Sequence, residues 1–295
     1  MDNDSNNSAE NQLRQMIGLE NIKKQFERYR NDFKLHRDGK VSGKFHQHMA
    51  FMGNSGTGKT TVARLFAEIL HEDGLLPQGQ FVEVTPLDLI GEYIGQTRPK
   101  TQAVCDRAKG GVLFIDEAYG LMSDIGQEAI EVLIKFMMNN DDTVVIFAGY
   151  SDEMEKFIDI TCIKAHFLPN RHTFYFEDYA PDSLFNILMD KLNGYEMTEE
   201  CESEMRKIIR YQYEHRDEKS WGNAQTMENY AKEILRIFFS NHHGDGIIDV
   251  DCIPERIRIP KENKKQLKEE LMLMVNEVQE KLQQLQSKLN ELSEE

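Results

Sequence analysis

The chain of 295 residues lacks long apolar runs, paired cysteines and a recognisable signal peptide. No apolar run approaches the roughly 20 residues that a helix needs to cross a bilayer, so we expect no membrane-spanning segment. The cysteines Cys105, Cys162, Cys201 and Cys252 are scattered, which is typical of a reducing compartment and argues against a zinc site. Residues 1–10 are acidic and rich in Asn, unlike a secretory leader. We therefore expect a soluble, cytoplasmic protein.

Basic residues are also scarce relative to acidic ones. The chain has 35 Lys and Arg residues against 51 Asp and Glu residues, which gives a formal net charge of −16. Nucleic-acid binding needs basic surface, so this composition argues against a nucleic-acid partner without forbidding a local basic channel. Hydrophobic residues make up 40% of the chain and support an ordinary packed core.

One glycine-rich segment carries the strongest functional signal. It lies between an apolar strand at residues 48–52 and a helical stretch at residues 60–70, and it matches the G-x-x-x-x-G-K-T pattern of a phosphate-binding loop. Glycines allow a tight loop whose N–H groups converge on one anion, and the following helix adds the positive end of its dipole. The residues expected to bind the nucleoside triphosphate, ATP or GTP, are Gly53, Asn54, Ser55, Gly56, Thr57, Gly58, Lys59, Thr60 and Thr61.

A pair of acidic residues supplies the second half of the expected site. Residues 111–115 form an unbroken apolar run, typical of a parallel strand buried on both faces, and Asp116 and Glu117 follow it. We expect Thr60 and Asp116 to hold Mg²⁺ and Glu117 to polarise the attacking water. Without the phosphate loop upstream, two solvated acids at the end of a strand would be the simpler interpretation.

Strand-like and helical segments alternate through the first 180 residues. This alternation predicts a parallel five-stranded sheet covered by helices, an α/β fold. The predicted strands span 48–52, 80–84, 111–115, 143–148 and 173–176. From Pro181 the periodicity is helical only, so the predicted organisation is a disordered stretch at 1–12, an α/β nucleotide-binding domain at 13–179, an all-α lid domain at 180–260 and a tail at 261–295.

The tail has an apolar seam of its own. Its apolar residues alternate in spacing between four and three, a heptad pattern that predicts a coiled-coil helix. The seam residues are Leu271, Val275, Val278, Leu282, Leu285, Leu289 and Leu292. An isolated helix of this length is marginal in water, so the seam packs back on its own chain, associates with another copy or docks on another protein.

These motifs together resemble the AAA+ ATPases, in particular the family of the Rubisco-activating protein CbbX and stage V sporulation protein K. The segments that carry the resemblance lie at residues 17–23, 48–54, 88–97, 112–119, 144–150 and 176–179. The resemblance implies ATP and Mg²⁺ bound between subunits of a ring, usually of six, that acts on a protein substrate. It also places Ile17 and Gly18 beside the adenine, Tyr93 and Ile94 in a pore loop, and Tyr150 at the sensing position.

The sequence departs from this family at two positions that matter for hydrolysis. The family supplies an arginine from the neighbouring subunit; here the stretch 163–172 offers Arg171, with Lys164 as the fallback. The family's Gly-Asn-Ala-Arg motif ends here in Gln225, an expected ATP-binding residue that can donate a hydrogen bond to phosphate but brings no charge, and Glu228 stands where another arginine is frequent. These changes predict weak or partner-dependent hydrolysis.

Three functions are compatible with these motifs and this composition. The first is an ATPase that remodels a partner protein through the pore loop. The second is an ATP-dependent scaffold or switch with little hydrolysis, or one subunit of a mixed ring. The third, a nucleic-acid motor, shares the ATP chemistry but is disfavoured by the strongly negative charge.

Overall fold

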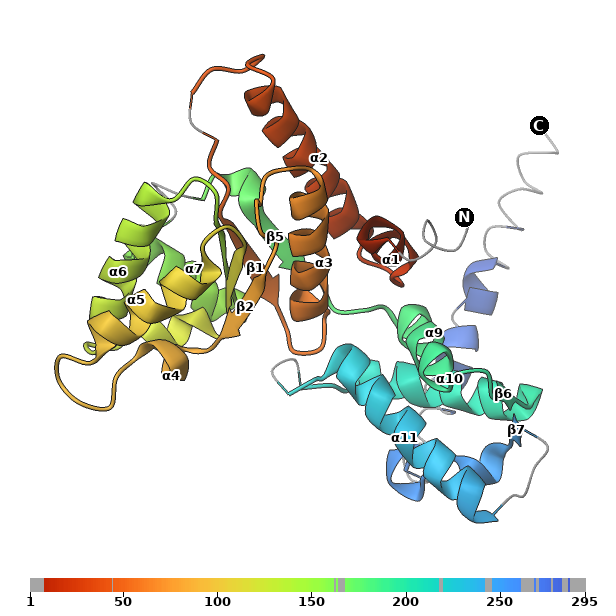
Figure 1. The fold of residues 1–295 in the computed structure, drawn as a ribbon. Helices are drawn as coiled ribbons and strands as arrows, with labels where there is room; N and C mark the ends of the chain where they lie inside the picture. Colours follow the sequence, from red (N-terminus) through yellow and green to blue (C-terminus); the bar gives the residue numbers. More distant parts are fainter. Residues whose placement is uncertain are drawn as a thin grey trace, which may run out of the picture. The chain divides into compact units, whose positions relative to one another are not determined.

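A five-stranded parallel sheet organises the first part of the chain (Figure 1). The computed structural model describes residues 8–43, 45–161, 163, 168–217, 220–241, 246–260, 268, 271–276, 278–282 and 286. The strands are β1 (Met49–Gly53), β2 (Phe81–Val84), β3 (Val112–Ile115), β4 (Val144–Gly149) and β5 (Thr173–Phe176). Their order is β2-β3-β4-β1-β5, and every neighbouring pair is parallel. The sheet confirms the predicted α/β fold, and each strand lies within one residue of its expected bounds.

Helices cover both faces of this sheet. The helices α5 (Thr97–Ala108), α6 (Gly126–Asn139) and α7 (Ser151–Ile160) lie on one face, and α2 (Glu20–Arg37) and α3 (Lys59–Glu72) lie on the other (Figure 1). The central strands β1, β3 and β4 are therefore buried at every residue, which explains why their sequences are continuous apolar runs.

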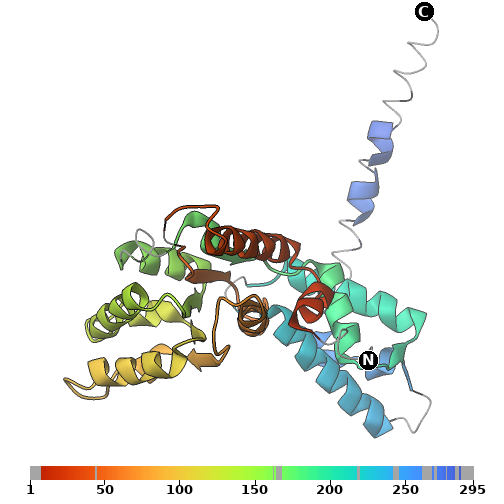
Figure 2. The ribbon, with the colours of Figure 1, turned by 45° about the horizontal axis from the view of Figure 1, so that its top comes forward.

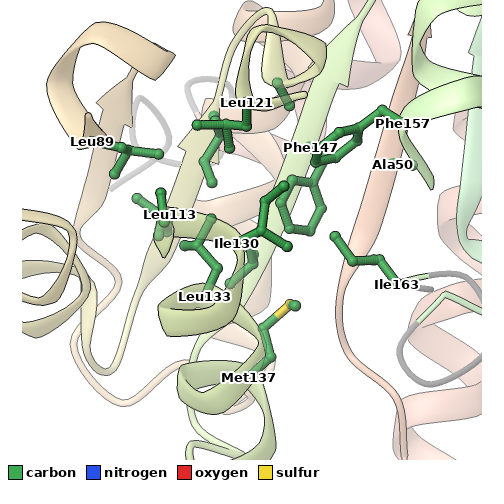
Figure 3. Packing of buried hydrophobic residues seen from close by; sticks show 14 of the residues in the cluster. Ala50, Leu89, Leu113, Leu121, Ile130, Leu133, Met137, Phe147, Phe157 and Ile163 are labelled. Carbon is green, nitrogen blue, oxygen red and sulfur yellow. The ribbon is translucent and has the colours of Figure 1, made fainter. Parts of the chain in front are cut away.

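Alternate residues along each strand build two separate cores. Figure 3 shows the cluster beneath α6, where Leu113 and Phe147 of the sheet pack with Ile130, Leu133 and Met137 of the helix. On the opposite face the ring of Phe51 lies 5.7 Å from that of Phe66 in α3 and 5.3 Å from that of Phe174 in β5. The helical spacing on α6 is thus used for packing, as its periodicity predicts.

The prediction of disorder at residues 1–12 is wrong for its last part. Ser8 caps α1 (Ala9–Gln15) by accepting a hydrogen bond from the backbone N–H of Asn11, and Ala9 and Leu13 are buried. The short helix packs against α3 (Figure 2). The polar sequence suggested disorder, but two buried apolar side chains hold this helix of almost two turns against α3. Residues 1–7 lie outside the described residues.

The chain divides into two compact units. The first contains residues 1–194 and 216–232, so it includes the sheet, α9 (Pro181–Lys191) and the first part of α11 (Asn223–Asn241). It therefore reaches beyond residue 179, where the sequence places the end of the nucleotide-binding domain. The second unit contains residues 195–215 and 233–295. The predicted domain boundaries stay predictions.

The second unit is built around α10 (Glu199–Glu214). The side chain of Thr198 caps this helix by accepting from the N–H of Cys201. Two short parallel strands, β6 (Glu196–Met197) and β7 (Ile247–Ile248), pair beside it, a feature that the helical periodicity did not predict. The 3₁₀ turns η4 (Val250–Cys252) and η5 (Glu255–Ile257) follow, and Gln212 donates to the carbonyl of Ile257 at 3.0 Å.

Only part of the predicted tail can be compared with the structure. Residues 268, 271–276, 278–282 and 286 are helical, and the seam residues Leu271, Val275, Val278 and Leu282 are exposed. The seam residues Leu285, Leu289 and Leu292 lie outside the described residues. The coiled-coil partner of this seam stays a prediction.

Candidate nucleotide site

The phosphate loop connects the end of β1 to the start of α3. Gly56 has φ +67°, and a Cβ there would collide with the carbonyl oxygen of Gly222, so glycine is required both by conformation and by space. The hydroxyl of Thr57 donates to the carbonyl of Asn54 at 2.8 Å and tightens the turn. Of the predicted binding residues, Gly53 ends β1, residues 54–58 form the loop at the carboxyl edge of the sheet, and Lys59, Thr60 and Thr61 begin α3.

Lys59 is the first residue of α3, directly after the loop. Its Nζ donates to the carbonyls of Gly53 and Asn54, both at 2.8 Å. Burial lowers the pKa of Lys59, and the nearby charges of Asp116 and Glu117 raise it in part. The ammonium is thus partly desolvated beside two carboxylates, a setting in which an added phosphate would strengthen its charged form.

Asp116 and Glu117 follow β3 at the same edge of the sheet. The N–H of Asp116 continues the ladder by donating to the carbonyl of Val84 at 2.9 Å. Glu117 has φ +50°, an uncommon conformation for a residue with a side chain, and its N–H donates to Oδ1 of Asp116 at 3.0 Å. Glu117 is exposed and Asp116 half-buried. The strained turn holds the two carboxylates in different surroundings.

Two tyrosines border these acids. Tyr150, the predicted sensing residue, follows β4, and its ring lies 6.2 Å from that of Tyr119. Burial, and then the charge of Glu117, raises the pKa of Tyr119 to about 12, so this hydroxyl stays protonated at neutral pH. Tyr119 packs on Gly149, where a Cβ would lie 2.8 Å from its ring. The sequence assigned Tyr119 to the acidic-strand motif but gave it no role in the site.

The segment expected near the adenine also reaches the loop. Gly18 has φ +68°, and a Cβ there would lie 3.3 Å from the ring of Tyr179. The hydroxyl of Tyr179 donates to the carbonyl of Thr57 at 3.2 Å, and burial raises the pKa of this tyrosine to about 12. Gly18 therefore lies against a side chain that contacts the loop, and Ile17 directly precedes it in the chain.

A polar cluster that the sequence reasoning missed holds the other side of the loop. Asn223, which is fully buried, donates to the carbonyl of Ser55 at 3.1 Å and to Asp178 at 2.8 Å. Asp178 also accepts from the side chain of Asn54 at 3.0 Å. The signal was present in the sequence, since Asp178 and Asn223 both belong to the quoted family motifs.

Gln225 lies next to the loop but is exposed. The preceding residue, Ala224, donates its N–H to the carbonyl of Gly56 at 3.1 Å, so the start of α11 is fixed against the loop. Glu228 pairs with Lys232 at 2.6 Å on the surface of the helix. Its carboxylate is thus compensated by a lysine one turn away.

Arg171 lies at the opposite edge of the sheet from the loop. It belongs to the turn η3 (Asn170–His172) just before β5, whereas the loop follows the end of β1, and the two strands are parallel. Its side chain is 59% exposed and pairs with Asp32 of α2 at 3.1 Å. Arg171 therefore lies away from the phosphate loop of its own chain, and its role toward the nucleotide of another chain stays a prediction. The fallback residue, Lys164, lies outside the described residues.

The predicted pore loop connects α4 (Pro86–Leu89) to α5. Tyr93 is 71% exposed and Ile94 is fully exposed, at 104%. The loop is closed at its base by a hydrogen bond from the N–H of Gly91 to the hydroxyl of Thr97 at 3.1 Å.

The described residues contain neither a metal-binding cluster nor a membrane-spanning helix. No group of three or more His, Cys, Asp or Glu side chains there is arranged to hold a metal ion without further ligands. In the same part of the chain, no helix has the length and apolar character required to span a bilayer. The expected cytoplasmic location stays a prediction.

Comparison with known proteins identifies the family. Residues 49–162 match the AAA family, ATPases associated with various cellular activities. CbbX of Cereibacter sphaeroides is 42% identical over 229 residues, 73% of this chain and 72% of its own. CfxQ of Xanthobacter flavus is 38% identical over 245 residues, 78% of this chain and 76% of its own. The chloroplastic ribulose bisphosphate carboxylase/oxygenase activase of Cyanidioschyzon merolae is 43% identical over 190 residues, 62% of this chain and 63% of its own.

A solved structure supports the same fold. The AAA domain of FIGL-1, determined in complex with ADP, matches 88% of this chain and 88% of its own with a TM-score of 0.55. Its sequence identity of 18% limits this likeness to the fold. The curated relatives and the sheet order together show that this chain belongs to the CbbX/CfxQ family of AAA ATPases.

Proposed function

We propose that this protein binds Mg-ATP in the phosphate loop and couples its hydrolysis to the remodelling of a partner protein. The observation that carries the proposal is the placement of Lys59, Asp116 and Glu117. Lys59 begins α3 after the loop that follows β1, the two acids follow β3, and the acids are close enough to influence the charge of the lysine. A cation for phosphate and two carboxylates in different surroundings are the parts that phosphoryl transfer to water needs.

Each residue has a separate task in this proposal. The N–H groups of the loop and Lys59 bind the phosphates, and Thr60 and Asp116 hold the metal ion. Mg²⁺ supplies charge neutralisation on the phosphates when it is bound. A site with one carboxylate and one hydroxyl fits Mg²⁺, because phosphates and water complete its coordination. Glu117 orients the attacking water and accepts its proton.

Replacing Glu117 tests this division of tasks. Glu117→Gln keeps the shape of the side chain but removes the proton acceptor, so phosphate release should fall by about 100-fold or more while ATP still binds. Phosphate release and calorimetric ATP binding should be measured on the same preparation. Unchanged turnover would remove Glu117 from the mechanism.

Subunit assembly follows from the position of Arg171. An arginine at the far edge of the sheet can neutralise charge on the nucleotide of a neighbouring subunit, which supports a ring with ATP between protomers. Six subunits are the expected number for this family, so we propose a homo-oligomeric ring.

The partner is proposed to be a polypeptide gripped by Tyr93 and Ile94. Tyr93 and Ile94 are exposed on the same loop, so their apolar side chains can contact a client polypeptide in the pore of the proposed ring. One relative is named as an activase of ribulose bisphosphate carboxylase/oxygenase. We assign this chain a protein client without naming Rubisco, because a shared ATPase fold does not fix the client.

A second candidate is an ATP-dependent scaffold, or a subunit of a mixed ring that needs another protein for hydrolysis. It is favoured by Gln225, which carries no charge beside the loop, and by the pairing of Arg171 with Asp32. Measuring the mass of the purified protein with and without ATP, alongside phosphate release, separates the candidates. Fast Mg-dependent release by a ring of this chain alone would eliminate the second candidate.

A further inference from the structure

Among the described residues of the second unit, the tail carries the largest group of exposed apolar side chains. Seven large apolar residues there are exposed: Leu271, Met272, Leu273, Met274, Val275, Val278 and Leu282. Val275, the most covered of the seven, is still 51% exposed. Soluble proteins rarely leave so continuous an apolar surface open to water, so this surface marks an interaction site.

Four of these residues form a stripe along the helix, called here the tail stripe. The tail stripe consists of Leu271, Val275, Val278 and Leu282. Spacings of four, three and four residues place them on one side of a helix, as in a coiled coil. From residue 275 onward, the opposite side carries the exposed polar residues Asn276 and Glu280. This part of the helix is therefore shaped for pairing with another helix.

The second unit offers no matching surface of its own in its described part. Outside the tail, its large apolar residues that are exposed are Phe239, at 56%, and Ile247, at 44%. A groove of about 330 Å³ beside α10 is lined mostly by charged side chains, those of Glu200, Glu204, Lys207 and Arg258. Two apolar residues and a charged groove do not cover a stripe of four apolar side chains, so the tail stripe needs a partner from outside this unit.

The residues beside the tail stripe permit pairing with a second copy in parallel. In a parallel coiled coil, the residue just before Leu282 faces a residue of the next heptad on the other helix. That pair is Lys281 of one copy and Gln286 of the other, and both residues are exposed in the single chain. A lysine beside a glutamine brings no like charges together, so no repulsion opposes this arrangement.

The proposed ring supplies both the direction and the concentration for this pairing. Subunits of a cyclic ring are related by rotation about one axis, so tails that run along that axis are parallel to each other. An isolated helix of this length is marginal in water. Tails attached to neighbouring subunits, however, meet at an effective concentration in the millimolar range, which favours their association.

We propose that the tails of neighbouring subunits pair as parallel helices through the tail stripe. The inference rests on the proposed ring, but it requires neither ATP binding nor hydrolysis. It assigns the tail a second copy of this chain as its partner. One consequence is that subunits stay associated through their tails after the nucleotide has left the phosphate loop.

Interchain disulfide formation tests the pairing directly. Parallel pairing places residue 275 opposite itself, so Val275→Cys oxidised with glutathione disulfide should form a covalent dimer at least about tenfold faster than Asn276→Cys. Asn276→Cys places the thiol one residue away from the tail stripe. The unaltered chain is the blank, and its cysteines Cys105, Cys201 and Cys252 are buried. Equal rates for the two variants, or no covalent dimer, would overturn the proposal.

A charged substitution tests whether the pairing holds subunits together. Val275→Glu puts a carboxylate into the tail stripe, so without nucleotide the concentration at which half of the chains dissociate should rise by about tenfold or more. Asn276→Glu adds the same charge beside the tail stripe and should behave like the unaltered chain. Analytical ultracentrifugation over a range of protein concentrations measures both. An unaltered chain that is monomeric throughout, or equal masses for the two variants, would contradict the pairing.

Calorimetry with Mg-ATP separates this proposal from the proposed function. Val275→Glu changes the tail and not the phosphate loop, so its ATP affinity should lie within about threefold of that of the unaltered chain. A ring that forms with Mg-ATP but gives no interchain disulfide at residue 275 would overturn the tail pairing alone. Absence of ATP binding together with a fast disulfide at residue 275 would refute the proposed nucleotide site and still support the tail pairing.

Discussion

Two glycine-containing loops of the first unit differ in how they are held. The phosphate loop is fixed by groups from distant segments: Tyr179 donates to the carbonyl of Thr57 at 3.2 Å, Asn223 to that of Ser55 at 3.1 Å and the N–H of Ala224 to that of Gly56 at 3.1 Å. The loop of Tyr93 and Ile94 is held at its base by its own residues, and both side chains are exposed.

The contrast matches two different physical tasks. An anion site gains affinity when its N–H dipoles are fixed before the ligand arrives, because no further ordering is then required. A loop that grips a changing polypeptide needs exposed apolar side chains and few fixed contacts. The same residue type, glycine, therefore serves rigidity in one loop and freedom in the other.

The largest expected effect comes from removing the cation of the rigid loop. Lys59→Ala should weaken ATP binding by about 100-fold or more, since it deletes a charge-assisted contact from a partly desolvated site. Calorimetry with Mg-ATP measures the change. Lys40→Ala, at an exposed lysine, is the control and should bind like the unaltered chain. Equal ATP affinities for the two variants would contradict the role of Lys59 in binding the phosphates.

A smaller and more selective effect is expected from the exposed loop. Tyr93→Ala should abolish the stimulation of phosphate release by an unstructured polypeptide such as casein, while basal release changes by less than about threefold. Tyr175→Ala alters another partly exposed tyrosine and should retain the stimulation. Normal stimulation in Tyr93→Ala would contradict the role of this loop in gripping a client.

The smallest expected effect is a difference in stability between two glycine substitutions. Gly56→Ala should lower the free energy of unfolding by about 2–4 kcal/mol, because a Cβ at φ +67° also collides with the carbonyl of Gly222. Gly95→Ala has φ +83° but no heavy atom within 4 Å of the added Cβ, so a loss of about 1 kcal/mol is expected. Urea unfolding of both variants measures the difference, and similar losses would show that the loops are equally free.

Much of the first unit could be predicted because each signal was local and strong. Continuous apolar runs marked β1, β3 and β4, since strands buried on both faces need no alternation. The G-x-x-x-x-G-K-T pattern located the phosphate loop, because all of its residues are consecutive in the chain. The helix α1 was missed because its stability comes from packing on α3, which a local pattern of polar residues does not reveal.

The site was harder to predict where contacts join distant parts of the chain. Nothing in the spacing shows that Arg216 meets Asp178, 38 residues earlier, or that Asn223 reaches Ser55, 168 residues earlier. Such contacts depend on the fold of the whole unit. The predicted role of Arg171 depends on a neighbouring subunit, and the pattern of residues within one chain does not specify such a contact.

Titration of the unaltered protein with Mg-ATP in a calorimeter tests the central claim most directly. The fixed loop, with Lys59 at the start of α3 contacting it, predicts saturable heat with one site per chain. An absence of heat up to millimolar ATP would contradict the claim that this loop is a prepared nucleotide site.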